Sequence, residues 1–361
     1  MASHPAVETF GTDRACVILK PENTADELPV KERVVTVVAP ARLHLGFVDL
    51  HGGLERIFGS LGLAIDEVAT RISVTRADRQ TASGPDGDRA ADYAESVMRG
   101  LDLRGNVAVN VIESIPEHAG LGSGTQLGLA VGLAIARLFE HDIGMTQLAA
   151  LVERGRRSGI GIGTFAHGGF IVDGGRGPGS AVPPVVSRLP FPCEWRVVLI
   201  LDEARSGLHG SGERTAFAAL PPMSEAVSGM LCRRLLMQIL PAIVERDFAA
   251  FCAGIGHVQD TMSGHFATAQ GGRYTSPLVG EVLGWFRSEG MEGIGQSSWG
   301  PTGFAFCADE RAATAVMDDV RRRWTGSSLR VVVASAANAG ATVQIGERRQ
   351  AEPALPQLSE V

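Results

Sequence analysis

The feature that most constrains this chain is a glycine-interrupted loop that stands directly before a long apolar segment. The stretch PEHAGLGSGTQLGLA spans residues 116–130 and places Gly120, Gly122 and Gly124 at alternate positions. The segment that follows, GTQLGLAVGLAIARLFE (124–140), is apolar on nearly every side of a helix, which predicts a helix buried in the core. Glycine permits positive φ and close approach of the backbone to a ligand or to another segment. The loop therefore has to serve either a ligand or very tight packing.

Both readings of the loop follow from its residue types. Backbone N–H groups of such a loop can converge with the free N–H groups of the following helix and bind a phosphate. The helix dipole adds about 0.3–1 kcal/mol to such binding, and up to about 2 kcal/mol in a partly buried site. Ser123 and Thr125 add hydroxyl donors. The alternative is a glycine-rich helix start that serves packing alone. The loop is not a Walker A loop, because the Lys-Ser/Thr ending is missing.

Composition narrows the class of protein. The chain has 361 residues, of which 45% are hydrophobic, enough for two domains or one large one. A net charge of -7 argues against a nucleic-acid binder or a binder of anionic membranes. No apolar run approaches the length of a membrane span, and no signal-peptide pattern is visible. The five cysteines form no CxxC pair, so we expect reduced thiols in a cytoplasmic protein.

Lysine is almost absent. The sequence contains Lys20 and Lys31, and the other basic residues are arginines. The body of the chain therefore offers no lysine for a Schiff base with a pyridoxal-type cofactor. A zinc site is not expected either, because the nine histidines form no HxxxH or HxH set.

The order of predicted elements favours two α+β domains. We expect a mobile arm over residues 1–30, an N-terminal domain over 31–185, a C-terminal domain over 186–346 and a loose tail over 347–361. The Pro-rich stretch 177–192 is typical of a domain linker or a sheet edge. Strands are predicted at 33–48, 106–114, 168–175, 194–201, 303–308 and 329–336, and helices at 124–140, 145–159, 276–290 and 309–324, with two or three more between 222 and 266.

Three motifs in order resemble those of the GHMP kinase superfamily. The loop at 116–125 resembles its phosphate loop, whose pattern is roughly Pro-x-x-x-Gly-Leu-Gly-Ser-Ser. PARLHLGFVD (40–49) looks like the N-terminal motif, and GQSSWGPTGFAF (295–306) looks like the C-terminal glycine-rich motif. The resemblance implies a ribosomal-S5-like N-terminal domain, a ferredoxin-like C-terminal domain and a site in the cleft between them. It also implies that Ser297, Ser298 and Gly300 support the phosphate loop rather than touch the substrate.

One position departs from the kinase pattern. Many kinases of the superfamily carry an aspartate in a segment like SGIGIGTFAHGG, and the ungapped alignment places that aspartate on Gly161. Glycine can neither accept a proton nor bind a metal through a side chain. Asp173 is an alternative source of the carboxylate. His167 lies in the segment where kinases keep their base; it is either a core histidine or a catalytic one.

The motifs also resemble one non-kinase branch of the superfamily, the β-ribofuranosylaminobenzene 5′-phosphate synthases of methanopterin biosynthesis. The Thr125-Gln126 ending of the loop, GLHGSGERTAF (207–217) and QDTMSGHFATAQGG (259–272) carry this resemblance. The implied reaction condenses phosphoribosyl pyrophosphate with p-aminobenzoate, or alternatively p-hydroxybenzoate, and releases carbon dioxide and pyrophosphate. Mg2+ and a homodimer are implied as well.

The resemblance assigns roles to further residues. Asp49 is expected to hold magnesium, a ribose hydroxyl or the amino group, and Arg56 the benzoate carboxylate or the pyrophosphate. From the residues alone, Asp49 reads as a turn cap and Arg56 as a surface charge. Arg42 and His44 lie two apart on one face of a strand and are expected to bind substrate and to act as an acid or base, or else to pack and bond backbone.

Ser211 and Arg214 belong to a glycine-rich stretch that reads either as a lid or as a simple loop. The arginines at 154, 156 and 157 are expected to cap a helix C-terminus, with anion binding as the second role. Two other functions stay open at this point. One is an ATP-dependent small-molecule kinase, which Gly161 opposes, and the other is a non-catalytic ligand sensor, which the intact loop glycines oppose.

Overall fold

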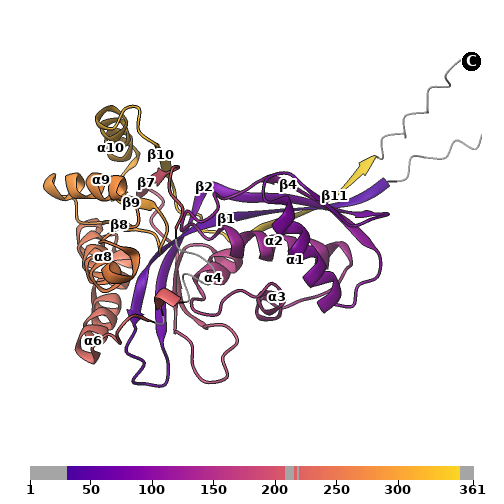
Figure 1. Ribbon diagram of the computed structural model, residues 1–361, viewed down its shortest axis with the longest axis horizontal. Coiled ribbons are helices and arrows are strands. Elements are labelled where there is room, and N and C mark those ends of the chain that lie inside the picture. Colours follow the sequence, from indigo (N-terminus) through magenta and orange to yellow (C-terminus); the bar gives the residue numbers. More distant parts are fainter. Residues whose placement is uncertain (1–30, 208–214, 218, 350–361) are drawn as a thin grey trace, which may run out of the picture. The chain divides into compact units, whose positions relative to one another are not determined.

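A computed structural model describes residues 31–207, 215–217 and 219–349 (Figure 1). Two antiparallel-rich sheets organise the chain. The strands are β1 (Lys31–Asp49), β2 (Phe58–Ala77), β3 (Thr81–Ser83), β4 (Asn106–Glu113), β5 (Phe170–Asp173), β6 (Val185–Leu189), β7 (Arg196–Asp202), β8 (Ile294–Gln296), β9 (Thr302–Cys307), β10 (Leu329–Ala334) and β11 (Thr342–Arg349). The helices are α1 (Gly87–Gly100), α2 (Ser123–Leu138), α3 (Met145–Leu151), α4 (Ile160–His167), α6 (Glu225–Arg234), the π-helix η1 (Leu235–Ile239), α7 (Leu240–Glu245), α8 (Phe248–Gln270), α9 (Pro277–Ser288) and α10 (Glu310–Arg323).

The first sheet has seven strands and is built around the long hairpin of β1 and β2. Its path runs β11-β1-β2-β4-β3, and β5 pairs with β2 and with β6. β2 is long enough to serve two neighbours: residues 60–63 pair with β5 and residues 71–77 pair with β4. The Pro-rich stretch thus ends in an edge strand, β6. In Figure 1, α1, α2, α3 and α4 lie on one side of this sheet.

The second sheet has four strands in the order β10-β7-β9-β8. An apolar cluster joins it to α9 and α10, with Phe286 and Val320 both fully buried in that cluster. α8 lies against β8 and contributes Phe251 and Ile255 to a further core cluster, which also holds residues of β1 and β2. Mixed helices and strands confirm the predicted α+β class.

The apolar segment after the glycine loop is a buried helix, as predicted. Thirteen of the 16 residues of α2 are buried. Gly128 and Gly132 let the neighbouring elements approach closely, since a Cβ there would lie 3.2 Å from Tyr93 and 2.4 Å from Leu148. The helix is therefore held on all sides, which positions its N-terminus firmly.

The predicted helix over 145–159 is wrong in its length. α3 ends at Leu151, because Glu153 adopts a φ of 54° and Gly155 a φ of 83°, both left-handed. The arginines that follow therefore lie on a loop rather than on the last turn of a helix. Their expected role as helix caps fails for that reason, and their side chains are available to the cavity described below.

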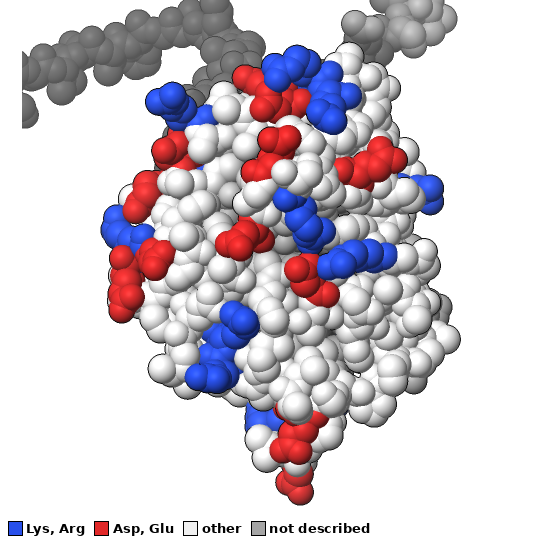
Figure 2. Space-filling view, turned by 90° about the vertical axis from the view of Figure 1, so that its left-hand side faces the viewer, with Lys and Arg blue, Asp and Glu red and all other residues white. Residues whose placement is uncertain are grey.

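One composite helix is long and apolar. Residues 225–245 form α6, η1 and α7 without a break, and among the described residues this is the one helix that length and composition would allow to cross a membrane. Core helices meet the same criterion, and Leu231, Leu235 and Ile239 of this helix are buried in the core. Figure 2 shows the face of the molecule that lies at the left of Figure 1, on which basic and acidic residues are interspersed rather than gathered by sign.

Candidate active site

An open cavity of about 960 Å³ lies beside the N-terminal end of α2. Its walls come from β1, α1, the loop after α3, and the segment around Ser298 and Trp299. Six arginines line it against two acidic residues: Arg42, Arg99, Arg154, Arg156, Arg157 and Arg176 face Asp92 and Glu153. This excess of positive charge suits a ligand that carries phosphates.

The three glycines of the loop are required for different structural reasons. Gly120 has a φ of 81°, and a Cβ on it would lie 2.2 Å from the carbonyl oxygen of Ser297. Gly122 has a φ of 87° and is the N-cap of α2. A Cβ on Gly124 would lie 2.8 Å from a guanidinium nitrogen of Arg89 and 2.9 Å from one of Arg154. Packing therefore demands Gly120, while Gly124 leaves room for two guanidinium groups at the start of the helix.

Ser297 joins the C-terminal glycine-rich motif to the phosphate-type loop. Its hydroxyl donates to the Gly120 carbonyl at 2.8 Å and accepts from the amide of His44 at 3.1 Å. Gln259 on α8 makes a parallel bridge: its side chain donates to the Leu45 carbonyl at 2.7 Å and accepts from the Gln296 amide at 2.9 Å. Loop, first strand and C-terminal motif are thus one hydrogen-bonded unit. This matches the predicted packing of that motif beside the loop.

Arg42 lies on β1 against the loop. Its guanidinium donates to the Gly120 carbonyl, its amide donates to the Leu121 carbonyl at 3.0 Å, and its Cγ would lie 3.0 Å from a Cβ on Gly122. The residue also lines the cavity. Arg42 is therefore placed to hold the loop and to face a ligand at the same time.

Arg154 lies beside the same helix start. It donates to the Tyr93 hydroxyl, and its Nε is buried without a hydrogen-bond partner in the described part of the chain. Arg89 forms ion pairs with Asp86 at 3.2 Å and Glu117 at 2.9 Å. Arg154 thus has an unused buried donor at a point where the free N–H groups of α2 are also expected.

His44 is buried, with 5% of its surface exposed, and its Nε2 has no hydrogen-bond partner among the residues that the structure describes. Burial, together with the nearby Arg42 and Arg157 guanidinium groups, lowers the pKa of His44 to about 3. The ring is therefore neutral at physiological pH. A β-bulge between His44 and Gly46 sits at this point of the β1–β2 hairpin, a device that often re-aims side chains next to active sites.

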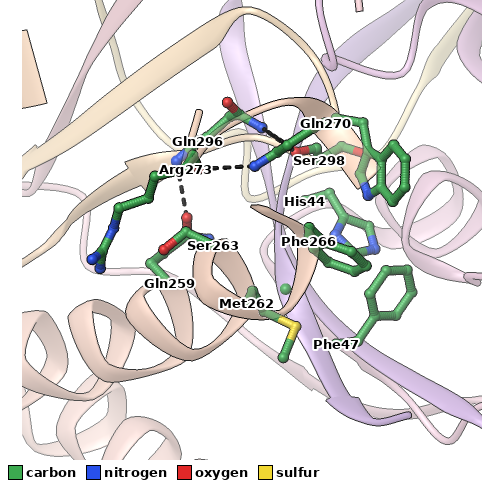
Figure 3. A pocket seen from close by; sticks show the side chains of 12 residues that line it. His44, Phe47, Gln259, Met262, Ser263, Phe266, Gln270, Arg273, Gln296 and Ser298 are labelled. Carbon is green, nitrogen blue, oxygen red and sulfur yellow. Dashed lines mark hydrogen bonds between the residues drawn. The ribbon is translucent and has the colours of Figure 1, made fainter. Parts of the chain in front are cut away.

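Figure 3 shows a smaller pocket that shares His44 and Phe47 with the main cavity. The labelled side chains of Phe47, Met262 and Phe266 lie around the His44 ring, and the amide groups of Gln270 and Gln296 lie at the opposite side. The His44 and Phe47 rings are 4.7 Å apart between centroids. This pocket adds to the main cavity a small recess with aromatic rings and Met262 on one side and polar side chains on the other.

Thr125 and Gln126 were both predicted to bind substrate, and the structure separates them. Thr125 lines the cavity. Gln126 is fully buried and donates to the Gly161 carbonyl at 2.9 Å, so it ties α2 to α4. Ser123 is buried in the first turn of α2.

Asp49 and Arg56 lie at the two ends of the β1–β2 connection, and neither is among the residues that line the main cavity. Asp49 Oδ1 accepts from the amides of His51 at 2.8 Å and Gly52 at 3.2 Å, which is a turn cap. Arg56 donates at 2.8 Å to the carbonyls of Gly174 and Gly175. Their predicted contacts with substrate stay predictions.

The remaining candidates lie elsewhere. His167 is exposed at the end of α4, in a separate surface pocket with Arg188. Asp173 is buried and accepts from the amides of Ser60, Gly159 and Gly175, so it does not supply a carboxylate to the cavity. Burial raises the pKa of the Asp173 carboxyl, and those amide hydrogen bonds offset part of the rise. Ser211 and Arg214 lie outside the described residues.

Several cavity residues escaped the sequence analysis. Tyr93 and Asp92 come from α1, and Arg176 from the loop after β5. Arg154 and Arg157 belong to a cluster of arginines next to a glycine. From the sequence, this cluster is interpreted first as the C-terminal cap of a helix and only second as an anion-binding group. Phe217 and Trp299 also line the cavity, and their rings stack with centroids 4.8 Å apart.

Comparison with known proteins agrees with the geometry. Residues 89–169 match the family described as GHMP kinases N terminal domain, and residues 239–326 match GHMP kinases C terminal. The beta-ribofuranosylphenol 5′-phosphate synthase of Archaeoglobus fulgidus is 32% identical over 85% of this chain and 98% of its own length. The protein of the same name from Methanothermobacter thermautotrophicus is 31% identical over 73% of this chain and 85% of its own length. Homoserine kinase from Cytophaga hutchinsonii has the same fold, with a TM-score of 0.63 at 16% identity over 86% of this chain and 97% of its own.

Proposed function

Because the chain belongs to the GHMP kinase superfamily, and within it to the family of the beta-ribofuranosylphenol 5′-phosphate synthases, we propose that it is a C-riboside synthase. Membership of this family makes it an enzyme. The proposed reaction joins phosphoribosyl pyrophosphate to a para-substituted benzoate and releases carbon dioxide and pyrophosphate. p-Aminobenzoate is the first candidate acceptor. p-Hydroxybenzoate is the second, since the relatives are named for a ribofuranosylphenol. We also propose methanopterin biosynthesis as the pathway.

The observation that carries the proposal is the arginine-rich cavity at the start of α2. The donor has a 5′-phosphate and a diphosphate, and six arginines with a helix N-terminus offer matching donors. The buried, unpartnered Nε of Arg154 is one such donor. An aromatic wall formed by Phe47, Phe58, Phe217 and Trp299 lines the same cavity and suits the benzoate ring.

The bonds of this reaction balance without an oxidant or reductant. The bond between the anomeric carbon and the diphosphate oxygen breaks, and the electron pair leaves with pyrophosphate. The ring carbon that bears the carboxylate attacks the anomeric carbon, driven by the para substituent. The bond to the carboxylate carbon then breaks, carbon dioxide leaves, and the electron pair restores the aromatic ring. Guanidinium groups stabilise the charge that develops on the leaving diphosphate.

Magnesium fits this site as an ion bound mainly by the diphosphate of the substrate, rather than as an ion coordinated entirely by protein side chains. No group of three or more His, Cys, Asp or Glu residues in the described ranges forms a metal site. The carboxylates that line the cavity are Asp92 and Glu153, and Glu153 already pairs with Arg156 at 3.1 Å. Mg2+ commonly binds through substrate phosphates with one or two carboxylates. We propose that it enters with phosphoribosyl pyrophosphate, with Asp49 as a further candidate ligand.

The benzoate carboxylate needs a contact that can loosen. A tight bidentate salt bridge would stabilise the carboxylate and resist its loss as carbon dioxide. Arg42 already donates to the Gly120 carbonyl, so its guanidinium would divide its hydrogen bonds between that carbonyl and the benzoate carboxylate. We propose a shared arginine contact of this kind for the acceptor; Arg56 remains the alternative.

The testing experiment follows the carboxyl carbon. Purified protein is incubated with Mg2+, phosphoribosyl pyrophosphate and p-aminobenzoate labelled at the carboxyl carbon, and released carbon dioxide is counted. A parallel reaction holds ATP in place of the donor, and a second series uses p-hydroxybenzoate. Label released only with phosphoribosyl pyrophosphate supports the proposal. Turnover of ATP without release of label from either acid would replace it with a kinase, and no turnover at all would favour a ligand sensor.

A further inference from the structure

Two polar atoms at the aromatic wall of the cavity are buried without a hydrogen-bond partner among the described residues: the indole donor Trp299 Nε1 and the imidazole nitrogen His44 Nε2. Phe47, Phe58 and Phe217 contact one another at centroid distances of 5.7–6.2 Å, and Phe217 stacks on Trp299 at 4.8 Å. His44 lies against this cluster through its contact with Phe47, and its Nε2 is buried without a partner. A buried polar atom without a partner costs about 1–3 kcal/mol and calls for an explanation.

The identity of the missing partner follows from the imidazole. One tautomer of the neutral imidazole carries its proton on Nδ1. The neutral ring then presents Nε2 as an acceptor. The partner must therefore be a donor that reaches an aromatic recess, such as an O–H or N–H group on a planar ring.

The position of Arg42 gives the other end of such a ligand. Arg42 and His44 lie two residues apart on β1, roughly 6.6 Å along the strand and on the same face. This separation is comparable to the length of a para-substituted benzoate. Arg42 is on the side of the glycine loop, where the donor phosphates are proposed to bind, and His44 is on the aromatic side.

We propose that His44 Nε2 accepts a hydrogen bond from the para hydroxyl or amino group of the acceptor, whose ring packs on Phe47 and whose carboxylate points towards Arg42. This inference rests on the proposed synthase function. It places the carboxylate-bearing carbon, the atom that attacks, on the side of the donor. His44 is then a residue that contacts the substrate and selects its para group.

The chemistry favours this arrangement in the transition state. When the ring attacks the anomeric carbon, positive charge spreads to the para substituent and makes its O–H or N–H a stronger donor. A hydrogen bond to a neutral imidazole strengthens at that moment, which is how a contact accelerates a reaction rather than merely binding substrate. Burial supports the role, since it keeps the His44 ring uncharged.

The test uses two acceptors of similar size. 4-(Methylamino)benzoate has an N–H to donate, whereas 4-methoxybenzoate carries the same methyl group without a donor. We expect the native protein to bind the methylamino acid roughly tenfold more tightly, measured by calorimetry. His44→Leu should reduce this ratio to about twofold or less and leave the KM for phosphoribosyl pyrophosphate unchanged. His44→Gln, which keeps an acceptor, should retain part of the ratio.

His141→Leu is the matched control, because His141 follows α2 outside the cavity and should leave the ratio intact. Equal binding of the two acids by the native protein would overturn the inference even if no His44 variant folds. An unchanged ratio in a folded His44→Leu protein would do the same. Either result leaves the synthase proposal standing if labelled carbon dioxide is released. Absence of both release and benzoate binding would remove the synthase proposal itself.

Discussion

Thr125 fills the space that any side chain at position 161 would need. A Cβ on Gly161 would lie 2.9 Å from Thr125 Cγ2 and 3.5 Å from its hydroxyl. The next residue, Gln126, donates to the Gly161 carbonyl at 2.9 Å. Gly161 is the position onto which the kinase aspartate aligns. The Thr-Gln ending of the loop and the glycine of α4 therefore depend on each other, and the loss of the carboxylate is built into the packing of two helices.

This packing predicts that Gly161→Ala destabilises the protein. The added methyl group meets Thr125 in a buried site, so we expect a loss of about 1–3 kcal/mol in the free energy of unfolding. Thr125→Ala in the same chain should recover most of the loss, because it empties the contested space. Gly284→Ala on α9 is the control, since a Cβ there meets nothing within 4 Å, and it should be neutral or stabilising. Denaturant unfolding of the four variants measures these differences; an additive double variant would contradict the contact.

Arg154 is predicted to bind the diphosphate. Arg154→Met removes a charged donor from the start of α2, and we expect affinity for pyrophosphate to fall about 10- to 100-fold, as for other charge-assisted hydrogen bonds. Arg137→Met provides the comparison, because Arg137 is exposed on α2 and pairs with Asp142. Titration calorimetry with pyrophosphate and Mg2+ separates the two. Equal losses in both variants would mean that binding responds to net charge alone.

Asp49→Asn distinguishes a turn cap from a catalytic or metal-binding carboxylate. Asparagine retains the oxygen that accepts from His51 and Gly52, so the unfolding free energy should change by about 1 kcal/mol or less. If Asp49 contacts magnesium or substrate, we expect carbon dioxide release to fall at least about 100-fold, a loss of the size seen when a transition-state contact is removed. Activity within about twofold of native would leave Asp49 as a cap alone. Single-turnover rates and thermal unfolding measure the two effects.

His44 makes the stability of the protein dependent on pH. Its folded pKa of about 3 lies below the ordinary value of 6.5, so its contribution to stability is present above pH 6.5 and is lost as the pH falls towards 3. At pH 4 the loss for this group is about 3 kcal/mol. We expect native protein to lose about that much more than His44→Leu between pH 7 and pH 4 in denaturant unfolding. Parallel pH profiles for the two proteins would show that His44 is already protonated or solvated in the fold.

Much of the fold could be predicted from local patterns. The buried helix α2 followed from its lack of a polar face, and the strands at β1, β4, β7 and β10 followed from runs of β-branched residues. The strand at β9 followed from the short apolar run GFAFCA. No element was predictable between residues 50 and 105 from local patterns, although β2 and α1 lie there and β2 alternates buried with less buried positions over its C-terminal half. The helix over 145–159 was overextended, since a left-handed glutamate ends it and glutamate carries no such signal.

The candidate site was less predictable than the fold. Sequence motifs identified Arg42, His44, Thr125 and the glycines as residues of one region, and these lie together. They did not separate Gln126, which is turned into the core, from Thr125, which faces the cavity. They also gave no means of adding Tyr93, and they did not single out Trp299 within the C-terminal glycine-rich motif.

The sequence by itself determined that the segment after the glycine loop is a buried helix, where several of the strands lie, and the family to which the chain belongs, because periodicity and motifs are local properties of neighbouring residues. Only the tertiary structure decided which distant groups meet. Ser297 reaches Gly120 across 177 positions, and the guanidinium groups of Arg89 and Arg154 converge at Gly124. Such meetings depend on how close two backbones can approach, and that distance is set by the packing of whole elements rather than by the residues of either one.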